Sequence, residues 1–95
     1  MKPYKVSIKL TSHSMDHDIH IKTAINKLIG YPSMVRVCIQ RLKQDIIFPI
    51  SYRLTVWYFL RQDWTPVMFL ADHLGGMGID IEEEELRQQG EREQG

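Results

Sequence analysis

A strictly alternating stretch near the start of the chain does most to limit what it can fold into. In residues 4–11, YKVSIKLT, every second side chain is apolar, and polar side chains, two of them lysines, stand between. This period of two predicts a half-buried β-strand, and the lysines favour an edge position. Because a strand cannot satisfy its own backbone hydrogen bonds, it must pair with another segment or with another molecule.

The period then changes to that of a helix. Within residues 14–30, apolar side chains recur three and four positions apart, which predicts an amphipathic helix. Ser14 or Asp16 can cap its start, and Gly30 suits its end. A second helix is predicted from Pro66 to Leu74, with Thr65 as its cap and Gly75 at its close.

Two segments between these helices fit either secondary structure. Residues 33–47 read as a helix capped by Ser33, although Val35, Val37 and Ile39 also alternate as in a strand; the helix is favoured. Residues 51–66, SYRLTVWYFLRQDWTP, fit both periods, and the choice stays open. Asp80 and Glu83 have the spacing of a capping box for a further helix in IEEEELRQQ.

Together these patterns predict an α+β fold that is mainly helical. One N-terminal strand precedes the helices, and an acidic helix and tail end the chain. The chain has 95 residues, enough for one small domain. Residues 1–61 hold ten Lys/Arg and three Asp, whereas residues 62–95 hold two Arg and nine acids. We therefore divide the chain into a compact basic domain, 1–76, and an acidic segment, 77–95.

The single cysteine and the hydropathy pattern favour the cytoplasm. Cys38 has no partner for an internal disulfide, and we expect it to be a small core residue. No apolar run reaches the ~18–20 residues that cross a bilayer, and the first residues do not form a signal peptide.

No arrangement of side chains predicts an enzyme, a cofactor or a metal. Three histidines, His13, His17 and His20, would share one face of a continuous helix and could then hold Zn²⁺. Because the predicted helix begins near residue 14, His13 falls outside that geometry, and we predict no metal site.

Basic residues in the 20–44 segment allow a helix-turn-helix hypothesis. The segment reads as a helix, a turn at Gly30 and a second helix that carries Arg36, Arg41 and Lys43. Such side chains could contact phosphates or guanine edges of DNA.

The aromatic stretch at 51–66 supplies the leading hypothesis. Leu54, Phe59 and Leu60 are expected in the core. Tryptophan, tyrosine and arginine are enriched at protein-binding hot spots, and the predicted contact residues are Arg53, Trp57, Tyr58, Arg61, Trp64 and Pro66. Acidic contacts to the partner are predicted at Glu82, Glu83, Glu84 and Glu85.

In its size, charge split and 51–66 stretch, the chain resembles the small accessory proteins of temperate phages, among them inhibitors of RecBCD-type helicase–nucleases. The resemblance implies a host DNA-processing enzyme as partner and a connection to DNA recombination. The leading prediction is therefore a non-enzymatic modulator, an inhibitor or adaptor, that binds a host enzyme. The alternatives are a helix-turn-helix DNA-binding regulator that uses residues 20–44, and an assembly subunit that donates its 4–11 strand to a neighbour.

Overall fold

Strands and helices follow one another in the order β-α-β-β-α-β. The computed structural model describes residues 2–43, 47–59 and 64–84. The elements are β1 (Tyr4–Ser12), α1 (Met15–Ile29), β2 (Met34–Arg41), β3 (Ile50–Tyr58), α2 (Pro66–Leu74), the short 3₁₀ helix η1 (Gly75–Met77) and β4 (Asp80–Glu84). The four strands form one sheet in the order β2-β3-β1-β4, and every neighbouring pair is antiparallel. Two interleaved split β-α-β units of this kind make the ferredoxin-like topology.

β1 lies inside the sheet, between β3 and β4. Its residues pair with β3 along its whole length, from Tyr4 opposite Tyr58 to Ser12 opposite Ile50, and Ser7–Thr11 also pair with β4. The predicted strand is confirmed, and its predicted edge position is wrong. The lysines of β1 lie on the sheet face opposite the helices. A strand with one solvated face shows the same alternation of apolar and polar residues at an edge and in the middle of a sheet, so the alternation does not identify an edge.

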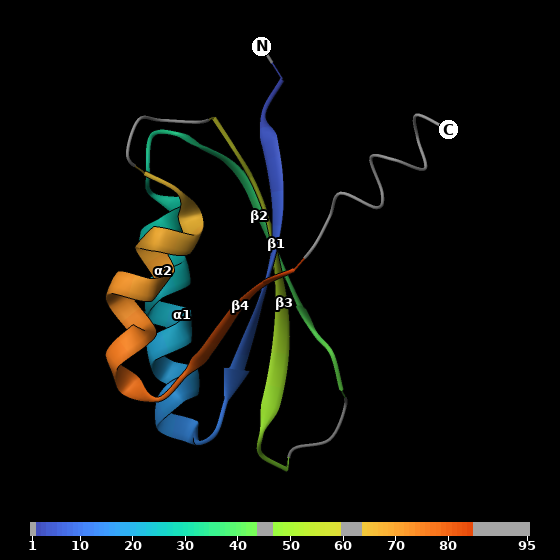
Figure 1. Cartoon of the computed structure of the whole chain (residues 1–95), viewed down its shortest axis with the longest axis vertical. Helices are drawn as coiled ribbons and strands as arrows, with labels where there is room; N and C mark the ends of the chain where they lie inside the picture. Colours follow the sequence, from blue (N-terminus) through green and yellow to red (C-terminus); the bar gives the residue numbers. More distant parts are fainter. Residues whose placement is uncertain (1, 44–46, 60–63, 85–95) are drawn as a thin grey trace.

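The two helices pack on one face of the sheet (Figure 1). The Ser14 hydroxyl accepts a hydrogen bond from the backbone N–H of His17 at 3.4 Å, and the Thr65 hydroxyl accepts one from that of Met68 at 3.1 Å. Pro66 opens α2 and Gly75 follows its last residue. Both helices and their caps are confirmed, because capping depends on residues close in sequence.

The prediction of a mainly helical chain is wrong, because the described residues form a four-stranded antiparallel sheet with only two short α-helices. Within the predicted helix at 33–47, Met34–Arg41 form the strand β2 and residues 44–46 lie outside the described residues; within the acidic segment, Asp80–Glu84 form the strand β4. The rest of that acidic helix, from residue 85, lies outside the described residues. β-branched side chains favoured extended structure in β2, while β4 is extended because it pairs with β1.

The core lies between the sheet and the helices. Its fully buried members come from strands and helices alike: Ile8, Leu10, Leu54, Val56, Ile21, Leu28, Leu70 and Leu74. Leu54 is thus confirmed as core, whereas Phe59 is 38% exposed, and Leu60 lies outside the described residues. Cys38 is half-buried on the opposite face of the sheet, so its predicted core role is wrong. In the described parts of the chain, neither helix combines the length and apolarity that a bilayer crossing needs.

Candidate binding face of the sheet

The sheet face opposite the helices is polar and carries no described element over it (Figure 1). Side chains on this open face alternate with the buried ones along each strand, so the strand register identifies them. They are Lys5, Ser7, Lys9 and Thr11 on β1; Arg36, Cys38 and Gln40 on β2; Ser51, Arg53, Thr55 and Trp57 on β3; and Asp80, Glu82 and Glu84 on β4. Trp57 is the one aromatic side chain among them.

The half of the open face next to β4 neutralises its own charges. The Arg53 guanidinium donates two hydrogen bonds to the Glu84 carboxylate, from Nε at 2.8 Å and from the terminal nitrogen at 3.1 Å. The Ser7 hydroxyl donates a third at 2.8 Å. These bonds, first of all those from Arg53, lower the pKa of Glu84, and the bonds to Glu84 raise the pKa of Arg53. Lys9 stands directly opposite Glu82 in the register.

The lowered pKa of Glu84 predicts an acid-dependent loss of stability. A carboxylate whose folded pKa lies below its ordinary value of 4.5 stabilises the fold above that value, and the contribution is lost as the pH falls through the folded pKa. We expect Glu84→Gln to lower stability at pH 7, and the difference from wild type to narrow steadily below pH ~4.5. Urea unfolding monitored by circular dichroism measures it.

The matched control for this prediction is Glu82→Gln, on the same strand and face. The described residues give Glu82 no hydrogen bond, and only Lys9 stands opposite it. Its effect at pH 7 should be smaller than that of Glu84→Gln. Equal pH profiles for the two variants would contradict the role given to the Arg53–Glu84 pair. Because that pair is partly solvated, its effect should be well below that of a core truncation.

At the other side of the open face, Trp57 stands between two cations. The register places Lys5 of β1 and Arg36 of β2 directly opposite it, one on each neighbouring strand. The Lys5 ammonium lies 5.5 Å from the indole centroid and the Arg36 guanidinium carbon 5.1 Å, both within cation–π range. Neither cation has an ion pair with a described acid. We call these three residues the tryptophan corner.

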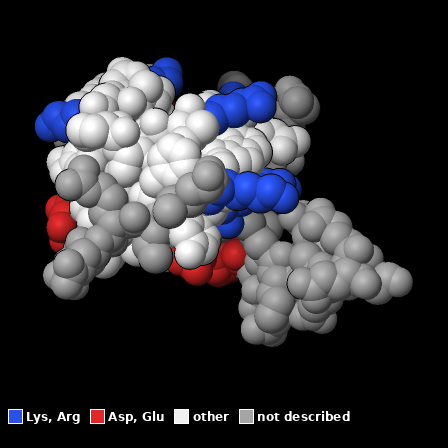
Figure 2. Space-filling model, turned by 90° about the horizontal axis from the view of Figure 1, so that it is seen from above, with Lys and Arg blue, Asp and Glu red and all other residues white. Residues whose placement is uncertain are grey.

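The charges around this corner are separated in space. Figure 2 views the end of the molecule at which β1 begins; the larger Lys and Arg patches lie on its right side, smaller ones lie at its upper left, and Asp and Glu atoms lie at its lower middle and lower left. The strand order explains the separation, because the acidic strand β4 is the outermost strand on one side and β2 on the other. The open face is therefore basic around Trp57 and acidic along β4.

The structure divides the contact residues that the 51–66 stretch predicted. Arg53 and Trp57 lie on the open face. Tyr58 lies on the helix side, where its ring is 6.0 Å from that of Tyr4 and burial, first of all, raises its pKa. Trp64 stacks on Tyr31 at 4.8 Å and packs against the core. Pro66 is buried at the start of α2, and Arg61 lies outside the described residues.

The acidic and basic sets are divided in the same way. Glu82 and Glu84 lie on the open face, Glu83 on the other side of β4 and Glu85 outside the described residues. Of the residues proposed to contact DNA, Arg36 lies on the open face. Arg41 lines a pocket on the helix side and Lys43 follows β2 in an exposed position. The predicted recognition helix is the strand β2, so the helix-turn-helix geometry is wrong.

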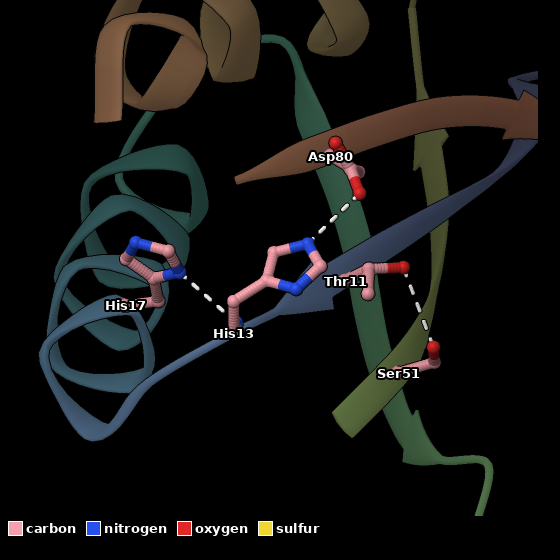
Figure 3. A network of polar contacts seen from close by, with 5 residues as sticks. All are labelled: Thr11, His13, His17, Ser51 and Asp80. Atoms are coloured by element: carbon pink, nitrogen blue, oxygen red, sulfur yellow. Dashed lines mark hydrogen bonds and ion pairs between the residues drawn. The ribbon is translucent and has the colours of Figure 1, made fainter. Parts of the chain in front are cut away.

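Two histidines of the predicted cluster, His13 and His17, make polar contacts where β1, α1 and β4 come together (Figure 3). The His13 ring contacts the Asp80 carboxylate, with Nε2 to Oδ2 at 2.9 Å. The His13 backbone N–H donates to Nδ1 of His17 at 3.0 Å. These contacts tie the β1–α1 connection to the start of β4. Among residues 2–43, 47–59 and 64–84, no three His, Cys, Asp or Glu side chains are placed to share a metal ion.

Lys5 is the member of the tryptophan corner that the sequence did not identify. It stands 52 positions before Trp57, and only the pairing of β1 with β3 joins the two. No family model, no curated protein and no solved structure matches the chain. The predicted connections to phages, to enzyme inhibition and to DNA recombination find no support in these comparisons or in the fold, and they are not part of the proposal below. The geometry of the open face is therefore the basis for the function proposed next.

Proposed function

We propose that this chain is a non-enzymatic binding protein whose tryptophan corner docks on an acidic surface of a partner protein. The observation that carries the proposal is the placement of Trp57 between Lys5 and Arg36, on a face whose other described cations stand against acids. Carboxylates of the partner would pair with the two cations while an apolar group contacts the indole. Tryptophan and arginine are the side chains that most often dominate such contacts.

Charge on the rest of the face favours a protein over nucleic acid. A single-stranded nucleic acid that binds across a four-stranded β-sheet contacts several of the β-strands. Here it would next meet the half of the open face along β4, where Lys9 and Arg53 already stand against Glu82 and Glu84, so these described cations are not available to pair with phosphates. A protein surface can instead contact the corner alone. The proposal also keeps the cytoplasmic location that the single cysteine led us to expect.

Capture from lysate of the source cells, with quantitative mass spectrometry, tests this proposal. The wild-type chain is compared with Trp57→Ala, Lys5→Glu and Arg36→Glu, each with and without nuclease. Capture of a partner that binds the tryptophan corner should survive nuclease treatment. The amount captured should fall at least tenfold with each of the three variants, because each variant removes one member of the corner. The purified partner should then show the same order of affinities by calorimetry.

The matched control is Lys27→Glu, which makes the same charge change at an exposed position on α1, on the other side of the sheet. It should leave capture unchanged. Partners that bind Trp57→Ala as strongly as wild type would overturn the proposal. Capture that disappears after nuclease treatment would indicate that the tryptophan corner binds nucleic acid and not protein.

A further inference from the structure

The two outer strands of the sheet carry opposite charges. β2, at one edge, has Arg36 and Arg41 and no acid. β4, at the other edge, has four acids and no base: Asp80, Glu82, Glu83 and Glu84. Neither strand pairs with a second described strand on its outer side. Charges on edge strands commonly prevent aggregation. Here β2 repels β2 and β4 repels β4, but β2 attracts β4 of another copy.

The direction of the strands permits such a contact. β4 and β3 both run antiparallel to β1, and β2 runs antiparallel to β3. A second copy placed at the edge in the same orientation would therefore set its β4 antiparallel to the first copy's β2, as the pattern of the sheet continues. From Arg36 onward in β2, and throughout β4, the even-numbered residues occupy the open face. The open faces and the helix layers of the two copies would then lie on the same sides.

Apolar side chains at these edges support the contact. Ile39 on the helix side of β2 is 50% exposed, and it lines a pocket of about 430 Å³ beside α1, together with Lys22 and Ile25. Ile81 occupies the helix side of β4 and is half-buried. In the register that sets Ile39 opposite Ile81 of the next copy, the two isoleucines cover each other. Glu83 of that copy then lies on the same side as Lys22.

From these observations we propose that copies of this chain associate head to tail, with β2 of one copy against β4 of the next. The contact is heterologous, so it continues into short chains of molecules unless the sheet twist closes a ring. Backbone hydrogen bonds supply the contact, and charge selects the unlike edge. Because the charges are exposed, the association should weaken strongly when the Debye length falls to ~3 Å at 1 M salt.

The single cysteine makes the proposal testable by disulfide crosslinking. Cys38 lies near the middle of β2, on its open face. When Ile39 stands opposite Ile81, Cys38 stands opposite Glu82. Three variants, Asp80→Cys, Glu82→Cys and Glu84→Cys, sample this register and its neighbours. Within one copy β2 and β4 are three strand spacings apart, ~14 Å, which exceeds the reach of a disulfide.

Mild oxidation followed by non-reducing electrophoresis gives the result. Each variant carries a cysteine at both edges of the sheet, so a variant whose cysteines meet should form a ladder of dimers, trimers and tetramers. The proposed register predicts that this variant is Glu82→Cys. Wild type, with Cys38 alone, should stay largely monomeric. In the Cys38→Ser background the ladder should disappear. Sedimentation velocity should show the mass of wild type rising with concentration in 50 mM NaCl and falling to the monomer in 1 M.

Three outcomes would overturn the proposal. Dimers in oxidised wild type without longer species would indicate symmetric pairing of β2 with β2. Absence of a ladder in all three variants would exclude contact between β2 and β4. A monomer at every concentration would exclude association altogether. Trp57→Ala should leave the ladder intact, which separates this proposal from the one on the tryptophan corner.

Discussion

Replacing Leu54 with alanine is expected to lower the free energy of unfolding by about 2–5 kcal/mol. Leu54 lies at the centre of β3, between Ile8 of β1 and Ile39 of β2, and its side chain is fully buried against the helices. Truncation removes apolar contacts and leaves a cavity that the two neighbouring strands hold open. Urea unfolding followed by far-ultraviolet circular dichroism measures the shift in midpoint at constant slope.

The adjacent residue provides the control. Thr55 lies on the same strand with its side chain on the open face, so Thr55→Ala removes little buried surface. Its expected cost is below ~1 kcal/mol, mostly from lost β-propensity. Similar losses of unfolding free energy for both variants would mean that side chains on the open face are buried as closely as those under the helices. That result would contradict the use of the open face for binding.

The sequence predicted those elements whose stability depends on neighbouring residues. The alternation in β1 and the caps Ser14 and Thr65 act within a few positions, and all three elements were found as expected. The helices predicted for the segments that hold β2 and β4 are wrong, because the conformation of these strands depends on partners far away in sequence. The Asp80–Glu83 spacing of a capping box says nothing of the pairing of β4 with β1 that decides its structure.

The candidate site was predicted in part for the same reason. Trp57 and Arg53 were predicted as contact residues because of their residue types. Arg36 was predicted as a DNA contact on a recognition helix, which the structure does not have. Which of them lie together is a property of the register, which joins Lys5, Trp57 and Arg36 across three strands. The stretch that looked like one surface supplies both faces of the sheet, because neighbouring residues in a strand point to opposite sides.

The two tryptophans are therefore expected to respond differently to truncation. Trp64→Ala should lower the free energy of unfolding by about 2–3 kcal/mol. Its ring stacks on Tyr31 at an interplanar angle of 14° and lies 6.4 Å from that of Phe69, so it closes one end of the core. Trp57→Ala removes two exposed cation–π contacts and should cost about 1 kcal/mol.

Urea unfolding of both variants, under the conditions used for Leu54→Ala, distinguishes these roles. A large loss for Trp57→Ala would make the tryptophan corner a structural feature and would remove the basis for its use in binding. A small loss for Trp64→Ala would leave that ring available to a partner and extend the contact surface around the end of the sheet. The expected order, with Trp64 much the more costly, leaves Trp57 as the tryptophan that can be changed to test binding in a folded chain.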